Sequence, residues 1–326
     1  LITQVEALSG NGVVALEQPD KNYQTILTQT DLDLLITTIS NAELISFDLE
    51  TTSITPLQAD IVGLSFSVKA NDGYYIPVEY PEKESKPGLT LDAVLEKLKP
   101  IFENENNRFC GQNIKYDALV LSRNGIHLGN IVFDTMIAEY MLHPEKNSYK
   151  MDYLSIDYLN YRMVPIDNLI GTGLHQKSMA EVPLEDIAFY ASEDADIAFQ
   201  LAEILKDKLE KESLFEPYND IEIPLIPVLT TIEKNGVYLN LDFLADLSRK
   251  FGEGLEKLTE KIHQMAGREF NINSPKQLGE ILFDELELKP IRKRSTAVEV
   301  LAVLKNYHPL PEEVLKYRHL AKLKNT

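Results

Sequence analysis

Two acidic residues, Asp48 and Glu50, end a short apolar stretch of the sequence, Leu44-Ile45-Ser46-Phe47. This composition predicts a buried strand over residues 44–48, and side chains two apart on a strand point to the same face. A pair of carboxylates at the end of a buried strand is costly unless a metal ion or a positive partner compensates the charge. The pair therefore indicates a candidate metal site. The alternative is a strand that simply ends in an acidic turn.

Three further aspartates could join this pair, because a hard divalent cation needs several carboxylate oxygens from different parts of a fold. Asp117 lies in the first turn of an expected helix, where the helix dipole alone also favours an acid. Asp134 opens another expected helix, and we interpret it as an N-terminal cap. Asp194 stands in an alanine-rich helical run, four residues after Tyr190 and thus on the same helical face. Of the three, Asp194 is the hardest to explain as an ordinary surface acid.

The elements that must position these acids alternate along the chain. The turn residues Asn71-Asp72-Gly73 predict a hairpin, and Thr30 or Asp31 is the expected N-cap of the first helix. Three strands followed by alternating helices and strands predict an α/β fold in which helices cover a mixed sheet. The expected strands are 44–48, 61–68, 73–78, 108–111 and 131–133, and the expected helices are 31–39, 91–103, 115–124, 134–142 and 184–211.

A change of pattern near residues 210–220, where several prolines fall, predicts two domains, 1–212 and 213–326. The segment 146–183 before this change is irregular. After it we expect a brief strand over 237–239 and then helices only, with Ser274 as an N-cap before Pro275. The expected helices of this part are 241–266, 275–286, 295–305 and 311–324.

Charge is distributed unevenly along the 326 residues, whose formal net charge is −19. Residues 246–326 hold 15 Lys and Arg against 12 Asp and Glu, which leaves 17 against 39 for residues 1–245. An acidic first part suits metal ions, and a mildly basic second part suits phosphates. The single cysteine, Cys110, excludes an internal disulfide and indicates a reducing cytoplasm, where a buried thiol serves packing. No apolar run approaches the length of a membrane span, so we expect no membrane partner.

Several motifs, in order, resemble known families. The stretches Phe47-Asp48-Leu49-Glu50-Thr51, Asn113-Ile114-Lys115-Tyr116-Asp117 and Tyr190-x-x-x-Asp194 resemble the three motifs of the tyrosine-type 3′–5′ exonucleases. Residues 222–237 resemble the opening of the polymerase domain in family A DNA polymerases of the bacterial polymerase I type. Residues 270–278 and 317–326 resemble the thumb of that family. The resemblance implies an RNase H-like mixed sheet flanked by helices, followed by an all-α thumb segment.

The resemblance also implies a role for each candidate. Asp48, Glu50, Asp117 and Asp194 would hold two Mg²⁺ or Mn²⁺ ions, with Asp48 bridging them. One ion would lower the pKa of the attacking water, and the other would stabilise the leaving 3′-oxygen. Tyr190 would orient this water rather than act as a base, because an unperturbed phenol titrates at about 10. The reaction would release nucleoside 5′-monophosphates from a DNA 3′ end, as in proofreading during replication and repair.

Contacts to DNA follow from the same resemblance, although lysines along a helix are ordinarily only a solvated face. We expect a monomer. In the family the carboxylates of polymerisation lie beyond the position of Thr326, so this chain alone should not polymerise DNA. The matching contact positions are Thr51, Asn113 and Lys150 for the single-stranded 3′ end, and Lys322, Lys324 and Asn325 for the duplex at the thumb.

Two alternatives remain open at this stage. An RNase D-like 3′–5′ exoribonuclease would carry the same carboxylates, but its helical part would lack the thumb motifs. A non-catalytic DNA-binding scaffold would keep the fold without turnover, and the presence of all four carboxylates and Tyr190 argues against a decayed site.

Overall fold

The computed structural model describes residues 20–85, 88–173 and 176–325. By its internal contacts the chain divides into two compact units, with the division between Gly236 and Val237. This differs from the expected boundary after residue 212. The reason is that Tyr218, Ile223 and Ile226 are buried in the hydrophobic core of the first unit.

The first unit contains a six-stranded mixed sheet in the order β1-β4-β3-β2-β5-β6. Strands β2, β3 and β4 pair in antiparallel fashion, and the hairpin between β3 and β4 is confirmed. The three outer pairings, β1 with β4, β2 with β5 and β5 with β6, are parallel. The strands are β1 Asn22–Thr25, β2 Ile45–Thr51, β3 Ile61–Ser67, β4 Asp72–Pro77, β5 Phe109–Gly111 and β6 Ile131–Asp134.

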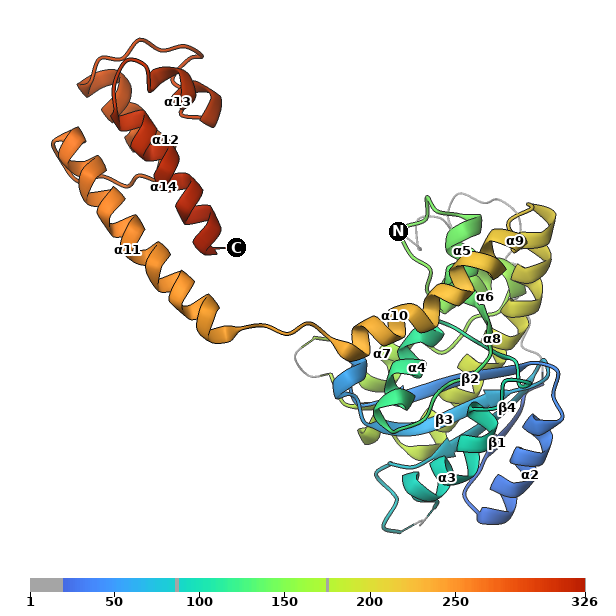
Figure 1. Cartoon of the computed structure of the whole chain (residues 1–326). Helices are drawn as coiled ribbons and strands as arrows, with labels where there is room; N and C mark the ends of the chain where they lie inside the picture. Colours follow the sequence, from blue (N-terminus) through green and yellow to red (C-terminus); the bar gives the residue numbers. More distant parts are fainter. Residues whose placement is uncertain (1–19, 86–87, 174–175, 326) are drawn as a thin grey trace. The chain divides into compact units, whose positions relative to one another are not determined.

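Helices cover both faces of this sheet, as Figure 1 shows. The long helix α8 packs against five of the strands, while α4 also contacts β2. The α/β prediction is therefore confirmed. The helices of this unit are α2 Gln29–Ser40, α3 Leu91–Phe102, α4 Ile114–Arg123, α5 Thr135–Leu142, α6 Met151–Leu159, α7 Ile166–Ile170, α8 Leu184–Lys211, α9 Phe215–Pro217 and α10 Ile223–Asn235, with shorter turns η1 Pro56–Gln58, η3 Met179–Glu181 and η4 Tyr218–Glu222.

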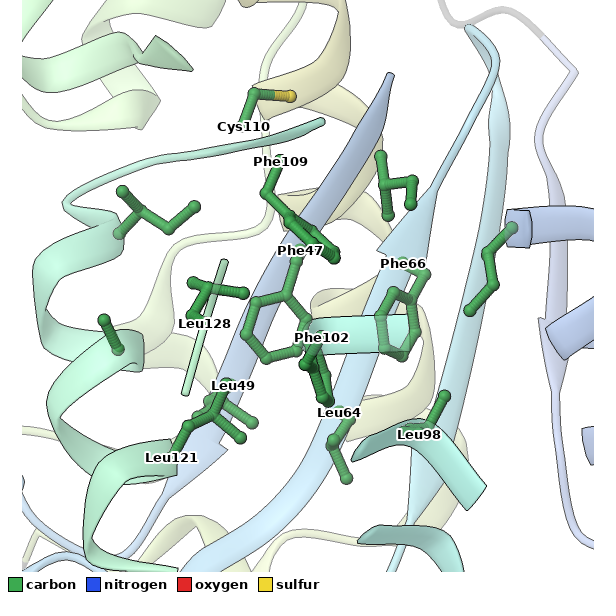
Figure 2. Packing of buried hydrophobic residues seen from close by; sticks show 14 of the residues in the cluster. Phe47, Leu49, Leu64, Phe66, Leu98, Phe102, Phe109, Cys110, Leu121 and Leu128 are labelled. Atoms are coloured by element: carbon green, nitrogen blue, oxygen red, sulfur yellow. The ribbon is translucent and has the colours of Figure 1, made fainter. Parts of the chain in front are cut away.

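Strand β2 directs apolar side chains to one face of the sheet and the two acids, Asp48 and Glu50, to the other. Phe47 is fully buried and packs edge-on against Phe102 of α3, with ring centroids 4.8 Å apart. Leu49 lies in the same core, as Figure 2 shows. Since side chains alternate along a strand, Asp48 and Glu50 are directed to the opposite face, toward α8. Burial of Phe47 and Leu49 thus fixes the direction in which the two acids point.

Most expected elements are present, and the differences are local. The N-cap of α2 is Thr28, whose side chain accepts from the Asp31 backbone, so the expected N-cap at Thr30 or Asp31 is wrong. Strand β1 was not expected, because its four residues carry no apolar alternation and lie mostly exposed. The segment 146–183 is less irregular than expected, since it contains α6 and α7. Cys110 is buried in the core as a packing residue.

The second unit is helical and has its own core, formed by residues such as Leu278, Leu301 and Val314. Ser274 caps α12 by accepting from the Gln277 backbone, as expected. Residues 237–239 form no strand, so that expectation is wrong. In the described part of the chain, no helix combines the length and apolar character needed to cross a membrane. The helices are α11 Leu241–Ala266, α12 Pro275–Glu280 continued by η5 Ile281–Glu285, α13 Val298–Leu304 and α14 Leu310–Asn325.

Candidate metal centre

Three carboxylates converge where β2 meets α8. One oxygen each of Asp48, Glu50 and Asp194 lies within 4.8 Å of the others. Asp48 and Glu50 share one face of β2, and Asp194 points inward from α8, which packs on that strand. The structure thus brings together residues that are more than 140 positions apart in the sequence. These three form the candidate metal centre.

Asp117 lies beside the three converging carboxylates but is held differently. It is buried in the first turn of α4, and its Oδ1 accepts a hydrogen bond of 3.0 Å from the Leu49 backbone. Burial, followed by the negative charge of Asp48, raises the pKa of Asp117. Leu49 lies between Asp48 and Glu50 in the sequence. Its hydrogen bond therefore holds the Asp117 carboxylate next to the acidic end of β2. Asp117 is therefore near enough to Asp48 to feel its charge, but it stands outside the group of three.

The ionised forms of the three converging carboxylates are disfavoured, as their raised pKa values show. Burial raises the pKa of Asp48 to about 7. For Glu50 and Asp194, burial is the main cause of a raised pKa, and the charge of Asp48 is the next. Among the described residues, no positive side chain contributes to the pKa shifts of Glu50 and Asp48. The described part of the protein therefore does not neutralise the negative charge of the cluster. A bound cation would supply the missing positive charge.

One carboxylate oxygen of Glu50 has no hydrogen-bond partner among the described residues, which indicates whether these residues fit a metal ion. Glu50 is only 6% exposed, and its Oε1 is buried without a hydrogen-bond partner in the described structure. Such an atom ordinarily costs about 1–3 kcal/mol. Carboxylate oxygens are the ligands that Mg²⁺ and Mn²⁺ prefer. The donor set and the orphaned oxygen therefore fit a hard divalent cation.

Tyr190 lies one helical turn before Asp194 on α8. Burial is the first cause of its strongly raised pKa, followed by the charges of Asp194, Glu50 and Asp48. Hydrogen bonding with Tyr190 in turn lowers the pKa of Asp194. The phenol therefore stays protonated near neutral pH and can act as a hydrogen-bond donor, not as a base.

A cleft of about 660 Å³ opens beside Glu50. Its lining includes the two residues expected at the terminal nucleotide, Thr51 and Asn113, together with Tyr116 and Lys177. The Tyr116 hydroxyl hydrogen-bonds Thr51 and the Ser53 carbonyl, which ties the end of β2 to α4. Sequence reasoning gave no role to Tyr116, although it precedes Asp117 in the second motif. Lys177 was missed because it lies in an irregular segment without a motif.

The other expected contact residues are not part of the cleft lining or lie in the second unit. Lys150 is exposed at the N-cap position of α6. Burial raises the pKa of Asp152, and the charge of Lys150 offsets part of this rise. Lys322, Lys324 and Asn325 are exposed near the C-terminal end of α14 in the second unit.

Asp134 is a structural residue, as expected. Its side chain accepts from the Ile137 backbone and so caps α5. The other oxygen accepts from the Ile114 backbone at 2.8 Å, which holds the start of α4 in place. Asp134 thereby positions the helix that carries Asp117.

By fold and site, the first unit is an α/β domain with a candidate metal centre made of converging carboxylates. The family model described as 3′–5′ exonuclease matches residues 23–210, and the model for DNA polymerase family A matches residues 241–326. The chain therefore belongs to the 3′–5′ exonuclease family of the DNA polymerase A type.

Similar proteins include the DNA polymerase I of Pseudomonas aeruginosa, 38% identical over 95% of this chain and 35% of the relative. Those of Borreliella burgdorferi and Chloroflexus aurantiacus are each 35% identical, over 95% and 99% of this chain and 34% and 35% of the relatives. The chain thus spans about a third of the length of these relatives. Among solved structures, the POL domain of Pol1 from M. smegmatis, in complex with DNA primer-template and dNTP, has a TM-score of 0.70 at 21% identity. That comparison covers 92% of this chain and 48% of the other, and it shows a shared fold.

Proposed function

We propose that the first unit hydrolyses the 3′-terminal nucleotide of DNA in a reaction that depends on divalent metal ions. The observation that carries this proposal is the convergence of Asp48, Glu50 and Asp194, with an orphaned Glu50 oxygen, at the edge of a cleft. Membership of the 3′–5′ exonuclease family supports the polarity of the reaction. The product is a nucleoside 5′-monophosphate.

Two Mg²⁺ or Mn²⁺ ions, when bound, would activate the attacking water and stabilise the leaving 3′-oxygen in an in-line displacement. Asp48, Glu50 and Asp194 would hold one ion, and Asp48 with Asp117 would hold the other. The Leu49 backbone donates to Oδ1 of Asp117, which would leave Oδ2 of this carboxylate for the ion.

The remaining residues bind and orient the substrate. Tyr190, which stays protonated and donates to Asp194, would accept a hydrogen bond from the attacking water and so leave the lone pair of this water directed at the phosphorus. Thr51 and Asn113 line the cleft in which the terminal nucleotide would lie, and Tyr116 fixes the Thr51 side chain there. The ammonium group of Lys177, also on the cleft wall, would attract the phosphate backbone of the strand.

The second unit would bind duplex DNA. Lys322, Lys324 and Asn325 on α14 would contact the backbone, and Lys150 of the first unit would contact the single strand. We further infer that the longer protein acts as a monomeric DNA polymerase in replication and repair. In that protein, this chain would remove misincorporated 3′ nucleotides. The names of the relatives support this role.

A degradation assay tests the proposal. The chain is incubated with Mn²⁺ and a 5′-labelled single strand, as DNA and as RNA of matched sequence. We expect stepwise shortening of the DNA from its 3′ end and release of 5′-monophosphates. Asp48→Ala should abolish the reaction, while the matched control Glu185→Gln, an exposed acid on the same helix as Asp194, should leave it unchanged.

The outcomes separate the alternatives. Preferential degradation of RNA would favour an exoribonuclease. An intact strand, with the wild-type chain and Asp48→Ala behaving alike, would favour a non-catalytic DNA-binding scaffold.

A further inference from the structure

The hydroxyl of Tyr75 is an unexplained polar group in the first unit. Tyr75, on β4, is completely buried, and its Oη has no hydrogen-bond partner in the described structure. Leaving such a hydroxyl unsatisfied costs about 1–3 kcal/mol, so packing alone would be served better by phenylalanine. Oε1 of Glu50 is another buried side-chain atom without a hydrogen-bond partner in the described structure.

Strand register places these two orphaned atoms on the same face of the sheet. Glu50 on β2 pairs with Gly63 on β3, and Tyr75 pairs with Ser65, two residues along β3. The Tyr75 side chain lies diagonally across Gly63: a methyl group built on this glycine would be 2.2 Å from Oη. The hydroxyl therefore ends over the direct cross-strand neighbour of Glu50. A side chain at position 63 would occupy the place of the phenol.

Electrostatics shows that the two groups interact. Burial is the main cause of the strongly raised pKa of Tyr75, and the charge of Glu50 is the other. A protonated phenol is a hydrogen-bond donor, and an ionised carboxylate is an acceptor with several free lone pairs. The phenol can therefore donate a hydrogen bond that the Glu50 carboxylate can accept.

We propose that Tyr75 is a positioning residue for Glu50, donating a hydrogen bond to the Glu50 carboxylate when this binds a metal ion. The inference rests on the proposed function, because it assumes an ion at Glu50. Carboxylates that bind metal ions are commonly hydrogen-bonded by a second group, which fixes their orientation. Here the phenol would hold one oxygen of Glu50 and leave the other for the ion. The absence of a side chain at Gly63 gives the phenol its path across the sheet.

A purely structural role for Tyr75 makes a different prediction. Its ring lies in a small apolar cluster with residues such as Ile187 and Ala188 of α8. If packing were its only role, Tyr75→Phe would keep the ring, remove an unsatisfied hydroxyl and leave metal binding untouched.

Calorimetric titration with Mn²⁺ alone, without DNA, distinguishes these roles. We expect Tyr75→Phe to raise the Kd for Mn²⁺ about 10-fold, the lower end of the range for groups that orient a metal ligand. Its free energy of unfolding in EDTA should be unchanged or higher. The matched control is Tyr158→Phe, a partly buried tyrosine of α6 whose hydroxyl donates to Glu139 Oε2 at 2.6 Å. This control should lower stability and leave the Kd for Mn²⁺ unchanged.

Glu50→Gln completes the experiment. In that background, adding Tyr75→Phe should change the Kd for Mn²⁺ no further, because the acceptor is already altered. If the wild-type chain binds Mn²⁺ and Glu50→Gln weakens binding, but Tyr75→Phe binds like the wild type, the inference about Tyr75 is overturned and the proposed function stands. If the wild-type chain binds no Mn²⁺, both are overturned.

Discussion

Replacing Asp194 by asparagine should stabilise the metal-free protein while removing its nuclease activity. Asn keeps the shape of the side chain and removes a charge that lies within 4.8 Å of Asp48 and Glu50. Two unit charges at that distance repel by about 3 kcal/mol at an effective dielectric constant of about 20. Proton uptake by the cluster relieves part of this repulsion, so we expect a net gain of about 1–3 kcal/mol at pH 8.

Thermal unfolding in EDTA measures this effect. For a domain of this size, 1 kcal/mol shifts the Tm by about 2–4 °C, so a rise of several degrees is expected at pH 8. At pH 5 the rise should be smaller, because Asp48, with a pKa of about 7, is then protonated. Saturating Mg²⁺ should stabilise the wild-type chain more than the variant, since only the wild type keeps all its ligands.

Asp196→Asn is the matched control on the same helix. Asp196 is buried but paired: it accepts hydrogen bonds from Lys21 at 2.6 Å and from Tyr23 at 2.8 Å. Breaking a buried ion pair costs about 3–5 kcal/mol, so this variant should lower the Tm. The reasoning is refuted if Asp194→Asn lowers the Tm in EDTA at pH 8 as Asp196→Asn does, because the three acids would then not repel one another.

Three further predictions follow from the structure. In EDTA, the free energy of unfolding should fall between about pH 4 and pH 7. Burial raises the pKa of Asp48 from 3.8 to about 7. The contribution of this carboxyl group to stability is therefore fully present below pH 4 and is lost as the pH rises through its pKa in the folded protein. Urea denaturation of the wild type and Asp48→Asn at several pH values measures it, and a wild-type stability that rises relative to the variant over this range would contradict it. Phe47→Ala should cost about 3–5 kcal/mol in urea denaturation, because it empties the centre of the first core, and a loss below 1 kcal/mol would show that the site is not close-packed. Ser274→Ala should lower the stability of the second unit by about 1 kcal/mol, because it removes the N-cap of α12. Faster amide hydrogen exchange in the second unit should reveal this loss, and unchanged exchange there would count against the cap.

The long helices and the central strands were predictable because their sequences carry one clear period. Residues 184–211 and 241–266 were expected as helices and are helices over the same bounds. Strand β1 was not predictable, because its pairing partner β4 is almost fifty residues away and its own side chains are mostly exposed. Residues 237–239 have the composition of a strand, but a strand also needs a paired neighbour, and the structure gives them none.

The candidate site was predictable in part. The spacing of Asp48 and Glu50 indicates a shared face, but only the packing of α8 on β2 brings Asp194 to them. Asp117 lies outside the group of three, and the backbone hydrogen bond from Leu49 that holds its carboxylate could not be read from the motif. Tyr75 could not be found from the sequence, because its place depends on the register of three strands and on the missing side chain of Gly63.

Anomalous diffraction from crystals soaked in Mn²⁺ tests the metal centre most directly. We predict one Mn²⁺ peak within ligand distance, about 2.0–2.3 Å, of carboxylate oxygens of Asp48, Glu50 and Asp194, and a second peak between Asp48 and Asp117 when a nucleotide is bound. A single peak at the three acids without nucleotide would still support the centre. An absence of Mn²⁺ peaks at these carboxylates, under conditions in which the dissolved chain degrades DNA, would contradict the account.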